Sequence, residues 1–206
     1  MREPCISVVS VGGGPGTARA LVLRAALRSP SPARHAALNV QLRVEPGRRR
    51  YSPQERESLH DLLGPPESWT RSLRPFLWGC STATVWCFDE AHEFDLLFPR
   101  PAEPESPLAR YVAALAGGDA HLLLLFRGAV FCEGPGGRLE AHPVPHHTEC
   151  RALVPVELLR SLLSPHPGAA AESLSPLSQI ARPDTPAHAH HPPHRGPGVP
   201  SAEVRK

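Results

Sequence analysis

The stretch from Leu38 to Gly64 constrains the fold of this chain more than any other. Apolar and polar residues alternate over 36–45, which is the period of a β-strand with one buried face and one wet face. After a basic turn, Ser52-Pro53-Gln54-Glu55 supplies an N-cap, a proline at the first helical position and a glutamate three residues after the cap. An apolar stripe then runs to Gly64, which with the prolines after it ends the helix. We therefore predict a strand over 36–45, then a turn, and then a helix over 52–63.

Composition limits the size and class of the folded part. The 206 residues include 26 prolines and 16 glycines, so part of the chain is predicted to be unstructured. The formal net charge of +2 is too small to indicate binding to nucleic acid or to a membrane surface. No run approaches the roughly 18 apolar residues that span a bilayer, and the N-terminus does not resemble a signal peptide. We expect a cytoplasmic protein whose five cysteines are small buried hydrophobic residues or free thiols.

Short β-rich or alternating segments predict most of the remaining structure. Strands are expected at 6–11, 19–28, 82–88 and 94–98, and the unbroken apolar run around 122–126 predicts a central strand buried on both faces. Residues 110–115 and 121–127 suggest a hairpin around a glycine-rich turn, with a helix over 107–116 as the alternative. Two more short helices are predicted near 67–77 and at 154–163.

The character of the sequence changes after Ser164. Residues 165–206 contain nine prolines, five histidines and few large apolar residues, a composition that cannot bury enough surface to offset its ordering entropy. We predict a disordered Pro/His-rich tail behind a single α+β domain over 5–164. The domain is expected to be mainly antiparallel β-sheet, either sandwich-like or a curved sheet similar to that of SecB, with a few short helices.

A glycine-rich motif near the N-terminus suggests a cofactor site. A predicted strand runs into Gly12-Gly13-Gly14-Pro15-Gly16, as in the first turn of a dinucleotide-binding βαβ unit. However, Thr17 stands where a third glycine or alanine is needed, and the following segment alternates as a strand. The favoured interpretation is a loop between two antiparallel strands, and the alternative is a protein that binds a nucleotide or flavin through Gly12–Gly16.

Histidines and cysteines suggest a metal site only weakly. His146-His147 lie close to Cys150, and six residues separate Cys80 from Cys87, whereas structural zinc sites show two tight ligand pairs. The tail histidines belong to a low-complexity segment: His188, His190, His191 and His194. No nucleophile elbow or other catalytic constellation is recognisable. We expect no metal, no cofactor and no enzymatic activity.

The strongest candidate surface for a partner is basic and aromatic. Arg48-Arg49-Arg50 forms a short cationic run, and two tryptophans and another arginine follow it in the sequence. Arginine and aromatic residues are favoured at protein interfaces, although a solvated turn and core tryptophans are the simpler interpretation. The candidate partner-binding residues are Arg48, Arg49, Arg50, Trp69, Arg74 and Trp78.

Four segments together resemble an uncharacterised bacterial family. They are 38–53, which includes Arg-Arg-Arg-Tyr, followed by 73–78, 111–115 and 123–131, the last with Phe-x-Gly-x-Val-Phe. The resemblance covers about residues 6–163, but the pair His146-His147 and the Pro/His-rich tail depart from the family pattern.

The resemblance carries a functional expectation but no catalytic residues. The family occurs mainly in high-GC soil bacteria, and its genes often lie beside those for a [NiFe]-hydrogenase and its maturation proteins. It implies a non-enzymatic accessory protein whose partner is a hydrogenase subunit or a maturation factor. A holdase chaperone similar to SecB is a further alternative, based on analogy of the predicted sheet alone.

Overall fold

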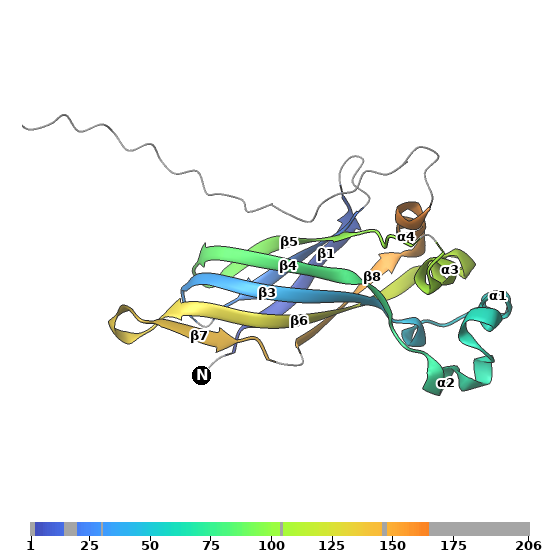
Figure 1. Ribbon diagram of the computed structural model, residues 1–206, viewed down its shortest axis with the longest axis horizontal. Coiled ribbons are helices and arrows are strands. Elements are labelled where there is room, and N and C mark those ends of the chain that lie inside the picture. Colours follow the sequence, from blue (N-terminus) through green and yellow to red (C-terminus); the bar gives the residue numbers. More distant parts are fainter. Residues whose placement is uncertain (1–2, 15–19, 30, 104, 146–147, 165–206) are drawn as a thin grey trace, which may run out of the picture. The chain divides into compact units, whose positions relative to one another are not determined.

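The computed structural model describes residues 3–14, 20–29, 31–103, 105–145 and 148–164 (Figure 1). Its strands are β1 (Cys5–Gly13), β2 (Ala20–Arg28), β3 (Ala33–Val44), β4 (Phe76–Phe88), β5 (Ala91–Pro99), β6 (Asp119–Glu133), β7 (Leu139–Pro143) and β8 (Thr148–Pro155). The helices are α1 (Pro53–Leu63), α2 (Trp69–Ser72), α3 (Pro107–Ala114) and α4 (Val156–Leu163), with short 3-10 turns at Pro46–Arg48, Pro66–Ser68 and Pro135–Gly137. The tail predicted over 165–206 lies outside the described residues.

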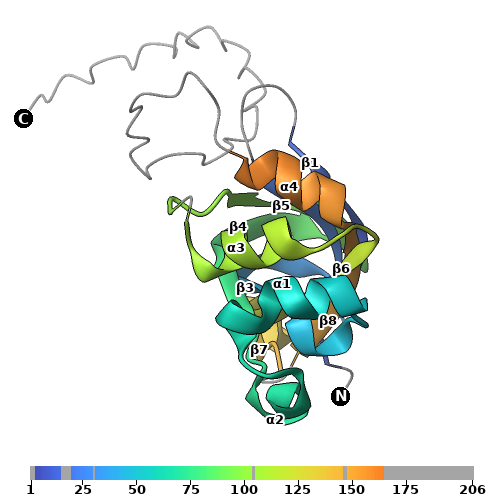
Figure 2. The same cartoon turned by 90° about the vertical axis from the view of Figure 1, so that its right-hand side faces the viewer.

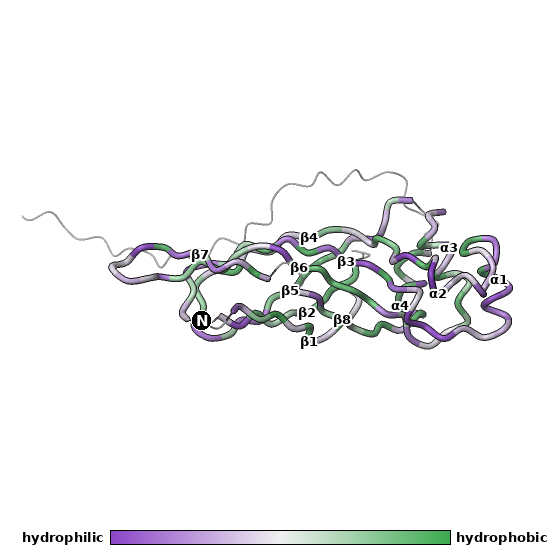
Figure 3. The backbone as a smooth tube through the Cα atoms, turned by 90° about the horizontal axis from the view of Figure 1, so that it is seen from below, coloured by the Kyte–Doolittle hydropathy of each residue, from purple (hydrophilic) through white to green (hydrophobic). Residues whose placement is uncertain are grey.

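The strands form two antiparallel sheets. One has the order β1-β2-β5, and the other has the order β4-β3-β6, with β7 and β8 both pairing along the far side of β6. Figure 3 shows the two sheets as two layers. Alternation along β3 places Leu38, Val40 and Leu42 in the core, where they share one apolar cluster with Leu21 and Leu23 of β2. The predicted antiparallel α+β class is confirmed.

Helices gather at one end of the sheets, where β3 ends and β4 and β6 begin. Figure 2 looks onto this end and shows α1, α3 and α4 side by side. Each helix is short but contributes buried residues, such as Leu59 of α1, Val112 of α3 and Leu159 of α4. Because these helices have fewer than a dozen residues, packing of their apolar faces contributes more to their stability than intrinsic propensity does. No helix among the described residues is long and apolar enough to cross a membrane.

Two local predictions were wrong. The segment 110–115 is helical as far as Ala114, in helix α3, as the alternative interpretation had it. Ser106 caps this helix by accepting a hydrogen bond from Ala109 N (3.3 Å), and Pro107 occupies its first turn. The second helix is also shorter than the predicted 67–77, since α2 ends at Ser72 and strand β4 begins at Phe76. Strand β8 was not predicted, and it occupies the segment before α4.

One glycine is required by the pairing of β3 with β6. Gly128 has φ +145°, and a Cβ atom there would overlap the backbone carbonyl of Ala37 on β3. Only a residue without a side chain fits this conformation at so close an approach. The glycine of the Phe-x-Gly-x-Val-Phe element is thus explained by strand packing.

We expect Gly128→Ala to lower the free energy of unfolding by at least about 2 kcal/mol, because it combines a strained φ with a backbone clash. Urea denaturation followed by circular dichroism measures the loss. Gly79→Ala on β4 is the matched control, since a Cβ at Gly79 has open space around it. Equal stability of the two variants would contradict this account of Gly128.

Candidate functional site

The helical end begins with a capping box at α1. Ser52 Oγ accepts a hydrogen bond from Glu55 N (3.2 Å), and Glu55 Oε2 accepts one from Ser52 N (2.8 Å). The sequence motif Ser-Pro-Gln-Glu predicted this arrangement. The cap fixes the direction of α1 and places the Glu55 side chain in the interior, where only 4% of the residue is exposed.

Arg49 joins that buried carboxylate to the sheet. Its Nη2 lies 2.8 Å from Glu55 Oε1 and also donates to Gly117 O, while Nη1 donates to Asp119 O (2.6 Å). Ala116 N donates to the same Glu55 oxygen at 2.9 Å. The pair therefore ties α1 to the loop between α3 and β6. Arg49 Nε is buried without a hydrogen-bond partner among the described residues.

The electrostatics of Glu55 follow from these contacts. Burial alone raises the pKa of the carboxyl group, but hydrogen bonds from Ser52 N and Ala116 N and the Arg49 guanidinium outweigh burial. Together they hold the Glu55 pKa at about 2, against an ordinary value of 4.5. Glu55 is therefore ionised at neutral pH, and its charge is balanced inside the fold by Arg49.

Two tyrosines and a tryptophan pack beside the ion pair. Tyr51 OH donates to Pro46 O (2.7 Å) and lies 2.8 Å from Tyr111 OH. Since the Tyr51 proton is used in this way, the Tyr111 hydroxyl is the donor between the two rings. Burial raises the pKa of both tyrosines. The Tyr51 ring meets the Trp69 ring edge to face, with 5.1 Å between centroids, and Trp69 Nε1 donates to Gly64 O (2.8 Å).

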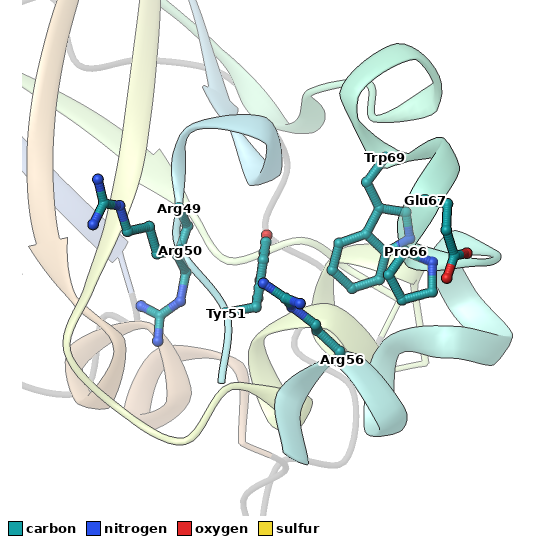
Figure 4. A pocket seen from close by; sticks show the side chains of 7 residues that line it. All are labelled: Arg49, Arg50, Tyr51, Arg56, Pro66, Glu67 and Trp69. Carbon is teal, nitrogen blue, oxygen red and sulfur yellow. The ribbon is translucent and has the colours of Figure 1, made fainter. Parts of the chain in front are cut away.

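Arg49, Tyr51 and Trp69 form part of the wall of a surface cavity of about 610 Å³. In Figure 4, Tyr51 and Arg56 lie between Arg49 and Arg50 on one side and Pro66, Glu67 and Trp69 on the other. These seven residues line the cavity. Within the part of the chain that the structure describes, Arg50 and Arg56 take part in no ion pair and both are exposed.

The cavity suits the binding of an acidic and partly apolar segment. Two guanidinium groups can each donate two parallel hydrogen bonds to a carboxylate, and Tyr51, Trp69 and Pro66 offer rigid apolar surface. Among the described residues that line the cavity, Glu67 is the one acid, and none is a serine, cysteine or histidine.

The structure brings together three of the six predicted partner-binding residues. Arg49, Arg50 and Trp69 line the same cavity. Arg48 instead forms an ion pair with Glu45, with 3.5 Å between Arg48 Nε and Glu45 Oε2. Arg74 is exposed and does not line the cavity. Trp78 is buried, and its Nε1 donates to Pro99 O (3.0 Å).

Sequence reasoning missed the cavity residues Tyr51, Arg56, Pro66 and Glu67. Tyr51 directly follows the basic run, and Arg56 lies in the first turn of the predicted helix. The positions of Tyr51 and Arg56 in the sequence could have added both to the predicted binding surface. The structural role of Arg49 was harder to predict, because its contacts with the segment 116–119 depend on the tertiary fold.

The glycine motif does not belong to a βαβ unit. Gly12 and Gly13 are the last residues of β1 and pair with Val22 and Leu21 of the antiparallel strand β2. Gly14 N donates to Ala20 O (2.8 Å), and residues 15–19 lie outside the described residues. The cofactor alternative required a helix after the glycines, and the strand β2 at 20–28 removes the basis for it.

The proposed metal ligands are not brought together in the described part of the chain. His146, His147 and the tail histidines lie outside the described residues. Elsewhere, no group of three or more His, Cys, Asp or Glu side chains is placed to hold a metal ion. Cys150 is buried and donates to Ile6 O (3.2 Å), while Cys80 and Cys87 are exposed on β4.

The chain is thus an antiparallel two-sheet protein with a helical end that carries a basic and aromatic cavity. Residues 15–172 match a family of unknown function, DUF6084, and the chain belongs to this family. A search of the curated proteins finds no match. Among the solved structures that match is one described as a late embryogenesis abundant (LEA) protein. It has 9% identity and a TM-score of 0.35, and the match covers 74% of this chain and 70% of that chain.

We expect Glu55→Gln to lower the free energy of unfolding at pH 7 by about 3 kcal/mol, because it leaves the buried Arg49 charge without a counterion. The folded-state pKa is below the unfolded value, so the ionised Glu55 stabilises the fold above about pH 4.5. This contribution is lost as pH falls from about 4.5 to about 2.

Urea denaturation at several pH values tests this expectation. The difference between wild type and Glu55→Gln should shrink over that acidic range. Glu57→Gln, at an exposed position of the same helix, is the control and should change stability by no more than about 0.5 kcal/mol at pH 7. A Glu55→Gln variant as stable as Glu57→Gln would show that the pair does not hold the helical end.

Proposed function

We propose that this chain is a non-enzymatic binding protein whose helical end docks an acidic segment of a partner protein. The observation that carries the proposal is the cavity beside Tyr51 and Trp69. Arg50 and Arg56 line this cavity, and neither forms an ion pair among the described residues. Exposed arginines beside rigid aromatic rings are the residue types that dominate binding energy at protein interfaces.

The wall of the cavity is held in place before any partner arrives. Arg49 is engaged with Glu55, Gly117 and Asp119, and Tyr51 is held by Pro46 and Tyr111. A preformed wall reduces the ordering entropy that binding must overcome. Arg50 and Arg56 then supply charge that steers an acidic partner and sets its register.

The family resemblance suggests the identity of the partner. An accessory role with a [NiFe]-hydrogenase subunit or a maturation factor is consistent with a binding surface that lacks a catalytic constellation. Cytoplasmic location is part of the same proposal. The acidic segment is expected to belong to one of those proteins.

We expect the double variant Arg50→Glu and Arg56→Glu to recover at least about tenfold less partner than wild type, because it places two negative charges against an acidic segment. The measurement is affinity purification of the tagged full chain from its native host, with quantitative mass spectrometry. The proposal requires that a hydrogenase subunit or a maturation factor is among the proteins whose recovery falls.

The matched control is Arg127→Glu with Arg138→Glu, which changes the net charge equally at exposed positions outside the cavity. Control and wild type should recover the same amounts. The proposal is wrong if the Arg50 and Arg56 variant loses nothing, or if wild type recovers neither kind of partner. Thermal unfolding of each variant confirms that the fold is intact.

A further inference from the structure

Strand β4 forms one edge of the five-stranded sheet. It pairs with β3 along one side, and no other described strand pairs with its outer side. The hairpin partner β5 crosses to the other sheet, where it pairs with β2. The outer edge of β4 therefore presents a row of backbone N–H and C=O groups that can accept another strand.

The sequence of β4 lacks the usual protection of such an edge. Between Phe76 and Phe88 there is no charged residue and no proline, although natural edge strands are commonly blunted by lysine, proline or short length. By contrast, the edge strand β5 carries Glu93 and Asp95, and β7 has only five residues. The edge strand β1 is also uncharged, but it is shorter than β4 and its register is broken between Val8 and Ser10. The β4 edge is thus long and uncharged, and no described strand pairs with its outer side.

The middle of β4 is regular enough to pair. From Cys80 to Trp86 the strand is in unbroken register with β3, between an irregularity near Gly79 and Cys87, which has φ +35°. The outer face of this segment presents Cys80, Thr82, Thr84 and Trp86, all exposed. Trp86 is 57% exposed, and its ring centroid lies 5.4 Å from that of His35. The His35 ring in turn stacks on Phe131.

We propose that β4 pairs antiparallel with β4 of a second copy of this chain, so that two five-stranded sheets join into one continuous sheet. A second copy suits this edge in charge and in residue type. An uncharged edge meets no like charge when it pairs with itself, and β-branched and aromatic residues are favourable cross-strand neighbours. An antiparallel pair of identical strands has two-fold symmetry and uses both open edges, so the assembly closes as a dimer.

The arginine cavity takes no part in this proposal, which is independent of the partner-binding function. Residues of β4 do not line that cavity. A dimer through β4 leaves the helical end of each copy available for its own partner. The two surfaces can therefore be tested separately in one set of variants.

The test compares the full wild-type chain with the double variant Thr82→Lys and Thr84→Lys. Sedimentation velocity over a range of concentrations should show wild type shifting from the mass of one copy to twice that mass. In the variant, repulsion between lysines across the two-fold axis should raise the concentration needed for dimerisation by about tenfold or more. Asn39→Lys is the control, since Asn39 is paired with Thr82 one strand further from the edge and should leave dimerisation unchanged.

Hydrogen exchange on wild type locates the interface without any variant. Amides within Cys80–Trp86 should exchange more slowly in a concentrated sample than in a dilute one, while amides of β1 and β5 should show no such dependence. A wild-type chain that stays monomeric overturns the proposal and leaves the edge to a strand of another protein. A dimer without this protection, or one that the lysines do not weaken, also overturns it.

Discussion

The buried pair of Arg49 and Glu55 is the interaction on which the helical end depends. Glu55 closes the capping box of α1 with one oxygen and accepts Ala116 N and Arg49 with the other. Arg49 extends the same connection to Gly117 O and Asp119 O, where β6 begins. Four short helices cannot hold one another by propensity alone. Polar contacts of this kind therefore decide where α1 begins and how it faces the sheet.

The same pair positions the cavity. Tyr51 lies between Arg49 and Ser52, so the backbone that carries it is held on both sides. Its ring contacts Trp69 and Tyr111, which connects the cavity wall to α2 and α3. Arg50 is exposed and lines the cavity. Neighbouring arginines in one run thus take different roles: both line the cavity, but Arg49 is engaged with Glu55, whereas Arg50 takes part in no ion pair among the described residues.

Much of the fold could be predicted from local patterns. The alternation of β2 and β3, the capping box of α1 and the unbroken apolar run of β6 each have a short-range physical cause, and the structure confirms them. The segment 107–116 was harder, because a short amphipathic helix and a buried strand look alike when the apolar run is brief. Ser106 and Pro107 were the signals that favoured the helix. The pairing of β7 and β8 along one side of β6 depends on long-range contacts that no local pattern reveals.

The candidate site was partly predictable for a related reason. Residue type drew attention to the arginine run and Trp69, and three of the six residues meet at one cavity. The other three lie elsewhere: Trp78 packs in the core, Arg48 pairs with Glu45, and Arg74 is exposed outside the cavity. Whether a charged or aromatic residue faces solvent or an internal partner is settled by tertiary packing.

Hydrogen exchange of an Arg49→Met variant tests the central claim most directly. Removing the guanidinium leaves Glu55 buried without its counterion and frees the segment 115–119 from α1. If the pair holds the helical end, amides of α1 and of 115–119 should exchange at least about tenfold faster than in wild type, with those of β3 and the middle of β6 unchanged. Unchanged exchange throughout α1 would contradict the claim that this ion pair organises the helical end and its cavity.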